Sequence, residues 1–111
     1  MKYVKIPSAY NVGGQPMEVR MVERCDDNAM GICHVCAGYI EIADKVFKDD
    51  KQSAGSKTNS FYHELTHSIL ATMGEKELND NEKFVCSFSS FLNEAMAAAV
   101  FIEEEEEEEG K

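Results

Sequence analysis

The pentapeptide His63-Glu64-Leu65-Thr66-His67 constrains the fold of this 111-residue chain more than any other feature. The chain has three histidines, and two of them lie here, four positions apart. Positions i and i+4 of an α-helix lie one above the other, so His63 and His67 would point to the same side. Two imidazole nitrogens on one face can hold a metal ion, and Glu64 can reach a water beside that ion without being a ligand. The pattern therefore predicts a helix that carries part of a metal centre, with Glu64 as the candidate general base.

The residues around this motif predict where the helix begins and ends. Thr58, Asn59 and Ser60 are candidate N-cap residues just before it. Gly74 follows directly, as the residue after a helix end often does. A helix of about 13–15 residues is expected, from near Ser60 to Met73. The alternative is a surface helix with two ordinary histidines and a solvated glutamate.

A catalytic zinc site needs a third protein ligand, and Glu82 is the best candidate for it. It opens a second helical pattern, for which Asp80 or Asn81 is a plausible N-cap. Glu75 and Glu77 are rivals, but they lie in the connecting turn. The simpler alternative for Glu82 is a first-turn carboxylate that complements the helix dipole. The pattern itself rests on apolar residues spaced by three and four: Phe84, Phe88, Phe91, Leu92, Ala95, Met96 and Ala99.

The first half of the chain predicts strands, so the expected fold class is α+β. Residues Met17–Arg24, Met30–Val35 and Tyr39–Ala43 each read as a strand. We expect a three-stranded antiparallel sheet packed against the motif helix and the C-terminal helix. Lys45–Asp50 is expected to form a helical turn, and the polar stretch Lys51–Lys57 a loop. Turn-forming residues also cluster at 12–16 and 25–28.

Composition indicates one domain over residues 1–102 and an acidic tail over 103–111. The net charge is −10, but seven consecutive glutamates, 103–109, account for much of it. Like charges at i,i+4 oppose a helix, so the tail is expected to be disordered; docking to a basic partner is the alternative. No basic stripe favours nucleic acid, and no apolar run indicates a signal peptide or a membrane span. A cytoplasmic protein that acts on neither nucleic acid nor membrane is expected.

Four cysteines provide a competing metal site. Cys33-His34-Val35-Cys36 is a C-x-x-C pair, which is half of a structural zinc site. Cys25, Cys86 or His34 could complete it, but Cys25 and Cys86 are isolated in the sequence. Cys86 also falls in the apolar pattern of the second helix, where buried free cysteine is common. Buried thiols are expected; a second structural metal and a redox pair remain open alternatives.

The segments Phe61–Leu70 and Glu82–Phe88, which read FYHELTHSIL and EKFVCSF, resemble the gluzincin zinc peptidases. They are most similar to the small phage- and prophage-associated groups, the ImmA/IrrE-like peptidases and the minigluzincins. The resemblance covers residues 59–92. It implies a zincin-like core, a Zn²⁺ ion held by His63, His67 and Glu82, and hydrolysis of a peptide or protein substrate with Glu64 as the base.

The resemblance also implies how a substrate would lie, and where this chain departs from the larger peptidases. The strand Tyr39–Ile42 is expected at the rim of the cleft, where it would pair with an extended peptide; an ordinary sheet strand is the alternative. The chain has no room for a helical second domain, and Tyr39 and Tyr62 are oxyanion candidates by residue type alone. Residues 1–16 are long enough to lie in a cleft and block it. A non-catalytic regulatory or peptide-binding module with a structural zinc site is therefore the alternative function.

Overall fold

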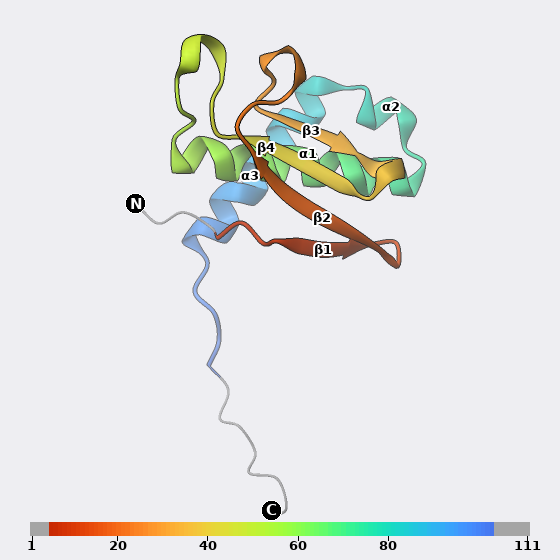
Figure 1. Ribbon diagram of the computed structural model, residues 1–111. Coiled ribbons are helices and arrows are strands. Elements are labelled where there is room, and N and C mark those ends of the chain that lie inside the picture. The colour runs from red at the N-terminus through yellow and green to blue at the C-terminus, as the bar shows by residue number, and fades with distance from the viewer. Residues whose placement is uncertain (1–4, 104–111) are drawn as a thin grey trace, which may run out of the picture.

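The computed structural model describes residues 5–103, which form an α+β fold and confirm the expected class (Figure 1). A long helix, α1 (Ala54–Met73), packs against a four-stranded sheet. A second long helix, α3 (Glu82–Ala98), packs against α1, and the single-turn helix α2 (Lys76–Asn79) lies between them in sequence. The expected acidic tail lies outside the described residues from 104 onward. Within residues 5–103 no helix is both long and apolar enough to cross a membrane.

The sheet has one strand more than expected, and its strands are not all antiparallel. Its strands are β1 (Ala9–Val12), β2 (Gln15–Val22), β3 (Gly31–His34) and β4 (Tyr39–Ala43). Their order across the sheet is β1-β2-β4-β3. The β1/β2 and β3/β4 pairs are antiparallel, whereas β2 and β4 run parallel. The prediction of three antiparallel strands is therefore wrong in strand number and in the pairing of β2.

The additional strand, β1, pairs with β2 through a two-residue turn. Gly13 and Gly14 have φ angles of +57° and +80°, which suit the hairpin turn that follows the twist of paired strands. The predicted turn cluster at 12–16 is thus a tight hairpin. Residues 9–16 are part of the sheet, so they do not lie in a cleft as a blocking segment. The sequence pattern does not predict a strand at residues 9–12.

Strand β4 is interior, which corrects its expected place at the rim. It lies between β2 and β3, and Ile40, Ile42 and Ala43 are all 0% exposed. Its two isoleucines pack with side chains of β2 and α1, and the core cluster comprises Met17, Ile40, Ile42, Phe61 and Tyr62. The most apolar strand gains most from burial between two neighbours. The two edge strands are β1 and β3, and β3 packs more extensively than β1 against α1.

Helix α1 begins six residues earlier than predicted, inside the stretch expected to be a loop. Its N-cap is Ser53, whose Oγ accepts a hydrogen bond from the backbone N–H of Ser56 at 3.1 Å. Thr58, one of the expected caps, instead donates its hydroxyl to the backbone carbonyl of Ala54 at 2.9 Å within the helix. The end of the helix is as predicted, since Gly74 has a φ of +77°. The helical turn expected near 45–50 does not form: Lys48 and Asp49 have φ angles of +57° and +64°, and the segment is a tight turn closed by antiparallel pairing of Lys45 with Lys51.

A buried glutamine explains the early start of α1. The Nε2 group of Gln52 donates to the carbonyls of Ala43 at 2.7 Å and Met30 at 3.1 Å. Its Oε1 accepts from the hydroxyls of Ser56 at 2.7 Å and Ser60 at 3.0 Å. This side chain thus uses both donors and both acceptor positions of its amide. It joins the first turns of α1 to the end of β4 and to the residue before β3.

Replacing this glutamine with an apolar residue of similar size should destabilise the fold. Gln52→Leu leaves buried polar partners without hydrogen bonds, so the free energy of unfolding should fall by about 2–4 kcal/mol. Urea unfolding followed by circular dichroism measures the change. The matched control is Gln15→Leu at an exposed position in β2, which should change stability by no more than about 0.5 kcal/mol. Equal effects of the two substitutions would contradict a bridging role for Gln52.

Candidate metal centre

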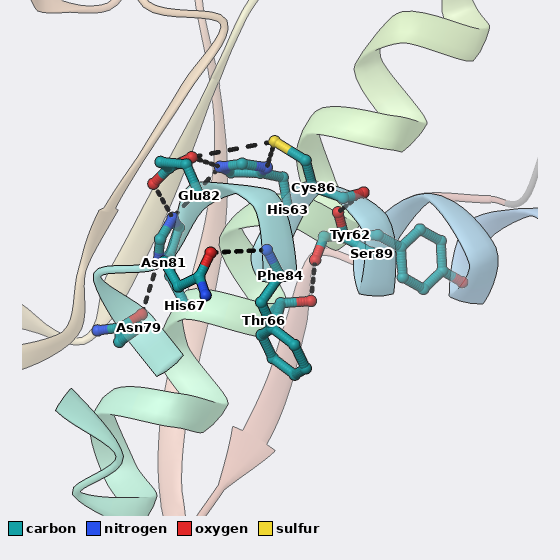
Figure 2. A network of polar contacts seen from close by, with 10 residues as sticks. All are labelled: Tyr62, His63, Thr66, His67, Asn79, Asn81, Glu82, Phe84, Cys86 and Ser89. Carbon is teal, nitrogen blue, oxygen red and sulfur yellow. Dashed lines mark hydrogen bonds and ion pairs between the residues drawn. The ribbon is translucent and has the colours of Figure 1, made fainter. Parts of the chain in front are cut away.

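Helix α1 presents both histidines of the motif on one side, as the sequence predicts. The Nε2 atoms of His63 and His67 lie 3.2 Å apart (Figure 2). Both side chains are partly buried, with 24% and 19% of their surfaces exposed. The pair is therefore sheltered by the fold but open to a ligand from one side.

The first residue of α3 faces this pair. Glu82 Oε2 lies 3.5 Å from His63 Nε2, and Oε1 lies 3.4 Å from His67 Nε2. Asn81 fixes the start of the helix, because its side-chain oxygen accepts from the backbone N–H of Phe84 at 3.1 Å. Donors about 2.0 Å from a tetrahedral zinc ion lie about 3.3 Å apart, which is close to all three measured separations. His63, His67 and Glu82 could therefore hold one metal ion with little movement.

The rival carboxylates lie elsewhere. Glu75 and Glu77 are exposed in and before α2, and neither lines the hollow that contains the histidines. Of the three acidic candidates that the sequence offers, the structure brings Glu82 alone to His63 and His67.

The surroundings of His63 favour the protonation state that binds metal. Burial lowers the pKa of His63, and the nearby His67 lowers it further, while Glu82 opposes both effects. A neutral imidazole has a free nitrogen lone pair, which the metal requires. The surroundings of His63 therefore favour a free nitrogen donor at this residue.

Glu64, the residue after His63 in α1, occupies a more enclosed position and lines the same hollow as the two histidines. It is 7% exposed, and burial raises its pKa to about 7; Glu82 adds to the rise, whereas His67 and His34 oppose it. Edge strand β3 approaches it closely at Gly31, where a Cβ atom would lie 3.1 Å from Glu64 Cγ. A carboxyl group that titrates near neutral pH can both accept and release a proton during a reaction.

Asn79, at the end of α2, is a site residue that sequence reasoning missed. Its Oδ1 lies 2.6 Å from His67 Nδ1, so the ring donates its Nδ1–H there and leaves Nε2 free (Figure 2). Such outer partners commonly fix the orientation of metal-binding histidines. Nothing in the polar stretch before Glu82 distinguishes this asparagine from Asn81, because the contact depends on where α2 lies.

The site opens into two adjoining hollows between α1 and β3. One has a volume of about 400 Å³ and the other about 300 Å³, and Gly31, His63 and Glu64 line both. The first extends toward α2 and the second toward the N-terminal half of α1. Together they form a groove that crosses the candidate metal centre alongside the edge strand. The remaining lining residues are Ile32, Cys33, Val35, His67, Ala71, Asn79 and Glu82 in the first, and Met30, Asn59, Ser60 and Cys86 in the second.

Neither tyrosine proposed for the oxyanion lines this groove. Tyr62 is buried in the core, with its ring 5.2 Å from that of Phe61. Tyr39 lies under the guanidinium of Arg20 at 3.8 Å and beside the ring of His34 at 4.5 Å. Both tyrosines thus have structural contacts that account for them.

Two of the four cysteines are buried or partly buried as expected, and two are exposed. All four are free; Cys25 is buried and Cys33 partly buried, but Cys36 and Cys86 are exposed. Burial raises the pKa of Cys25 to about 11 and of Cys33 to about 12, which disfavours the thiolate that metals bind. Within residues 5–103, His63, Glu82 and Cys86 form a group of three side chains whose possible ligand atoms all lie within 4.8 Å of one another, so Cys86 is a rival to His67 as a ligand. The expectation of a buried Cys86 is wrong, because it lies on the open side of α3.

No protein-family model, curated protein or solved structure matches this chain. Its function is therefore inferred from the residues and geometry of the site.

The buried carboxyl group predicts a pH-dependent effect on the metal-free chain. The folded-state pKa of Glu64 is about 7, above its ordinary value of 4.5, so the protein gains stability from protonated Glu64 at low pH and loses it as the pH rises through 7. Glu64→Gln imitates the protonated form. At pH 8 it should unfold with a free energy about 1–3 kcal/mol higher than the unsubstituted chain, and at pH 4 the two should agree. Urea unfolding in the presence of a chelator measures the free energy of unfolding at each pH. Glu77→Gln is the control at an exposed carboxylate. A stability difference between Glu64→Gln and the unsubstituted chain that does not depend on pH would contradict this account.

Removing the outer partner of His67 should weaken metal binding. Asn79→Ala deletes the oxygen that accepts from Nδ1, and losses of this kind typically lower metal affinity by about 10–100-fold. Asn79→Asp keeps an acceptor at the same place and should retain most of the affinity. Competition with a chromogenic chelator gives the zinc dissociation constants. An Asn79→Ala chain that binds zinc as tightly as the unsubstituted chain would show that the 2.6 Å contact does not orient His67.

Proposed function

We propose that this chain is a zinc-dependent peptidase, with Zn²⁺ held by His63, His67 and Glu82 and with Glu64 as the general base. The observation that carries the proposal is the set of donor separations, 3.2, 3.4 and 3.5 Å, beside a buried carboxyl group. Three protein ligands and an open side are the arrangement of a catalytic rather than a structural zinc site. The similarity of residues 59–92 to gluzincins supports the same reading.

Each group in the centre has a distinct role in this mechanism. Zinc, when bound, supplies the positive charge that makes a water acidic near neutral pH and polarises a carbonyl. Glu64 accepts the proton of the attacking water and then donates it to the leaving amine. His63 and His67 remain neutral donors, with His67 held by Asn79. Glu64 lines the same hollow as His63, His67 and Glu82, which is where the carboxyl is needed for this role.

The groove between α1 and β3 suggests how a substrate lies. An extended peptide can add to the free edge of a sheet through main-chain hydrogen bonds. Strand β3 is such an edge, and its residues Gly31 and Ile32 line the hollow with the histidines. We therefore assign the aligning role to β3 in place of Tyr39–Ile42. The edge is four residues long, which suits a short stretch of unfolded chain.

One observation favours a second candidate function. Among the residues that line the groove, no tyrosine, arginine, lysine or third histidine is present to stabilise an oxyanion. A zinc-holding module that binds peptides without cleaving them fits this lining. Its zinc would hold α1 and α3 together, and its groove would still take an extended segment.

The test of the proposal compares two substitutions at the centre. Glu82→Gln removes a charged ligand, so it should lose zinc and hydrolysis together. Glu64→Gln should keep zinc but lower hydrolysis at least about 100-fold, since it removes the base and leaves the ligands. Zinc is measured by atomic absorption after dialysis, and hydrolysis by release of fluorescence from labelled casein. Glu77→Gln is the matched control for both, since it alters an exposed carboxylate outside the groove and should change neither quantity.

Other outcomes separate the two candidate functions. Hydrolysis that survives in Glu64→Gln would refute the assigned base. Zinc retained equally by Glu82→Gln and the unsubstituted chain would remove Glu82 from the ligands. A chain that binds zinc and unfolded casein, but does not cleave it, would support the peptide-binding module.

A further inference from the structure

The two histidines of the centre have different partners behind them. His67 donates its Nδ1–H to an amide oxygen, that of Asn79, at 2.6 Å. The Nδ1 atom of His63 faces a sulfur instead, the Sγ of Cys86, at 3.9 Å (Figure 2). The same Sγ lies 4.0 Å from Glu82 Oε2. A single thiol on α3 therefore lies next to two of the three proposed ligands, one on each helix.

The chemistry of a thiol suits this position. It can accept one hydrogen bond and donate another, both weakly. Toward Glu82 it donates its S–H, and toward His63 it can accept Nδ1–H when Nε2 of that ring binds the metal. A hydroxyl oxygen at the same place would be too distant from both partners, since such bonds need about 2.7–3.2 Å. A carboxylate could accept from His63, but it would have no proton for Glu82 and would repel that side chain.

We infer that Cys86 is a positioning residue of the metal centre, whose thiol bridges His63 and Glu82 and so holds His63 with Nε2 toward the metal. The inference rests on the proposed metal centre and extends it. Because Nδ1 and not Nε2 faces the sulfur, Cys86 lies behind the His63 ring and acts through it. Cys86 is exposed and lines the second hollow, so reagents in solution can reach the thiol. Modification of this one thiol should therefore loosen both His63 and Glu82.

The first test compares two cysteines that are both exposed. Cys86→Ala should weaken zinc binding about 10-fold, at the low end for outer partners because sulfur bonds are weak. Cys36→Ala is the matched control, since Cys36 lies outside both hollows, and it should change nothing. Chelator competition at fixed pH gives the affinities. Equal zinc affinity in Cys86→Ala and the unsubstituted chain would overturn the inference.

A second readout follows the hydrogen bond itself, in the zinc-loaded chain. With Nε2 of both histidines bound to the metal, each Nδ1 would carry a proton. The His63 Nδ1–H should exchange with water faster in Cys86→Ala than in the unsubstituted chain, whereas the His67 Nδ1–H should not change, because Asn79 still accepts from it. An unchanged exchange rate at His63 would overturn the inference even if the substitution altered metal affinity through packing.

Reversible modification avoids reliance on the folding of a variant. In the Cys36→Ala chain, methyl methanethiosulfonate converts the Cys86 thiol to a methyl disulfide, and the thiol proton leaves with methanesulfinate. Bound zinc should dissociate about 10-fold more readily after modification, and dithiothreitol should restore the affinity. Retention of zinc by the fully modified chain would overturn the inference.

Cobalt distinguishes the failure of this inference from that of the proposed function. With one equivalent of Co²⁺, the unsubstituted chain should show weak visible bands without thiolate charge transfer. Strong near-ultraviolet charge transfer that disappears in Cys86→Ala would make Cys86 a direct ligand, which overturns the positioning role and leaves the metal centre intact. A chain that binds neither Co²⁺ nor Zn²⁺ would refute the proposed function and this inference with it, whereas unchanged zinc affinity in Cys86→Ala would refute this inference alone.

Discussion

The packing of α3 against α1 is the contact on which the candidate centre depends. Two candidate ligands come from α1 and one from α3, so the separations of 3.5 and 3.4 Å between Glu82 and the two histidines exist only while the helices stay in register. Val85 and Ser89, spaced by one helical turn, are the most buried residues of α3, at 0% and 1% exposure. A small serine and a branched valine allow this close approach. Bound metal would reinforce the same contact, since an ion that joins two elements adds its binding energy to folding.

The connection between these helices sets their register. Gly74 ends α1 in a left-handed conformation, and α2 then takes the chain back toward the site. Asn81 caps α3 one residue before Glu82, so the carboxylate projects from the first turn toward the histidines. The same connection places Asn79 against His67. One short segment thus supplies a ligand, a cap and an outer partner.

The edge of the sheet gives the centre its other wall. Strand β3 lies against α1, and Gly31 lets its backbone pass close to Glu64. This burial raises the pKa of Glu64 toward neutrality, and the hollows on either side leave the ligand side open. Glu64 is therefore buried, whereas its neighbour His63 on the same turn of α1 is more open to solvent. This difference in burial gives the two side chains different chemistry.

The sequence by itself determined that two long helices carry His63, His67 and Glu82. The spacing of His63 and His67 and the cap before Glu82 are local patterns, because helix geometry relates residues within a few positions of one another. Strand Tyr39–Ala43 was predicted with its observed bounds because the alternation of side chains along a strand is also a local pattern. Tertiary structure alone decided the rest: that β4 is interior, that α1 begins at Ser53 through the contacts of Gln52, and that Asn79 and Cys86 stand behind the histidines. These features join residues distant in sequence, and no local pattern records which side chains the packed helices and strands bring together.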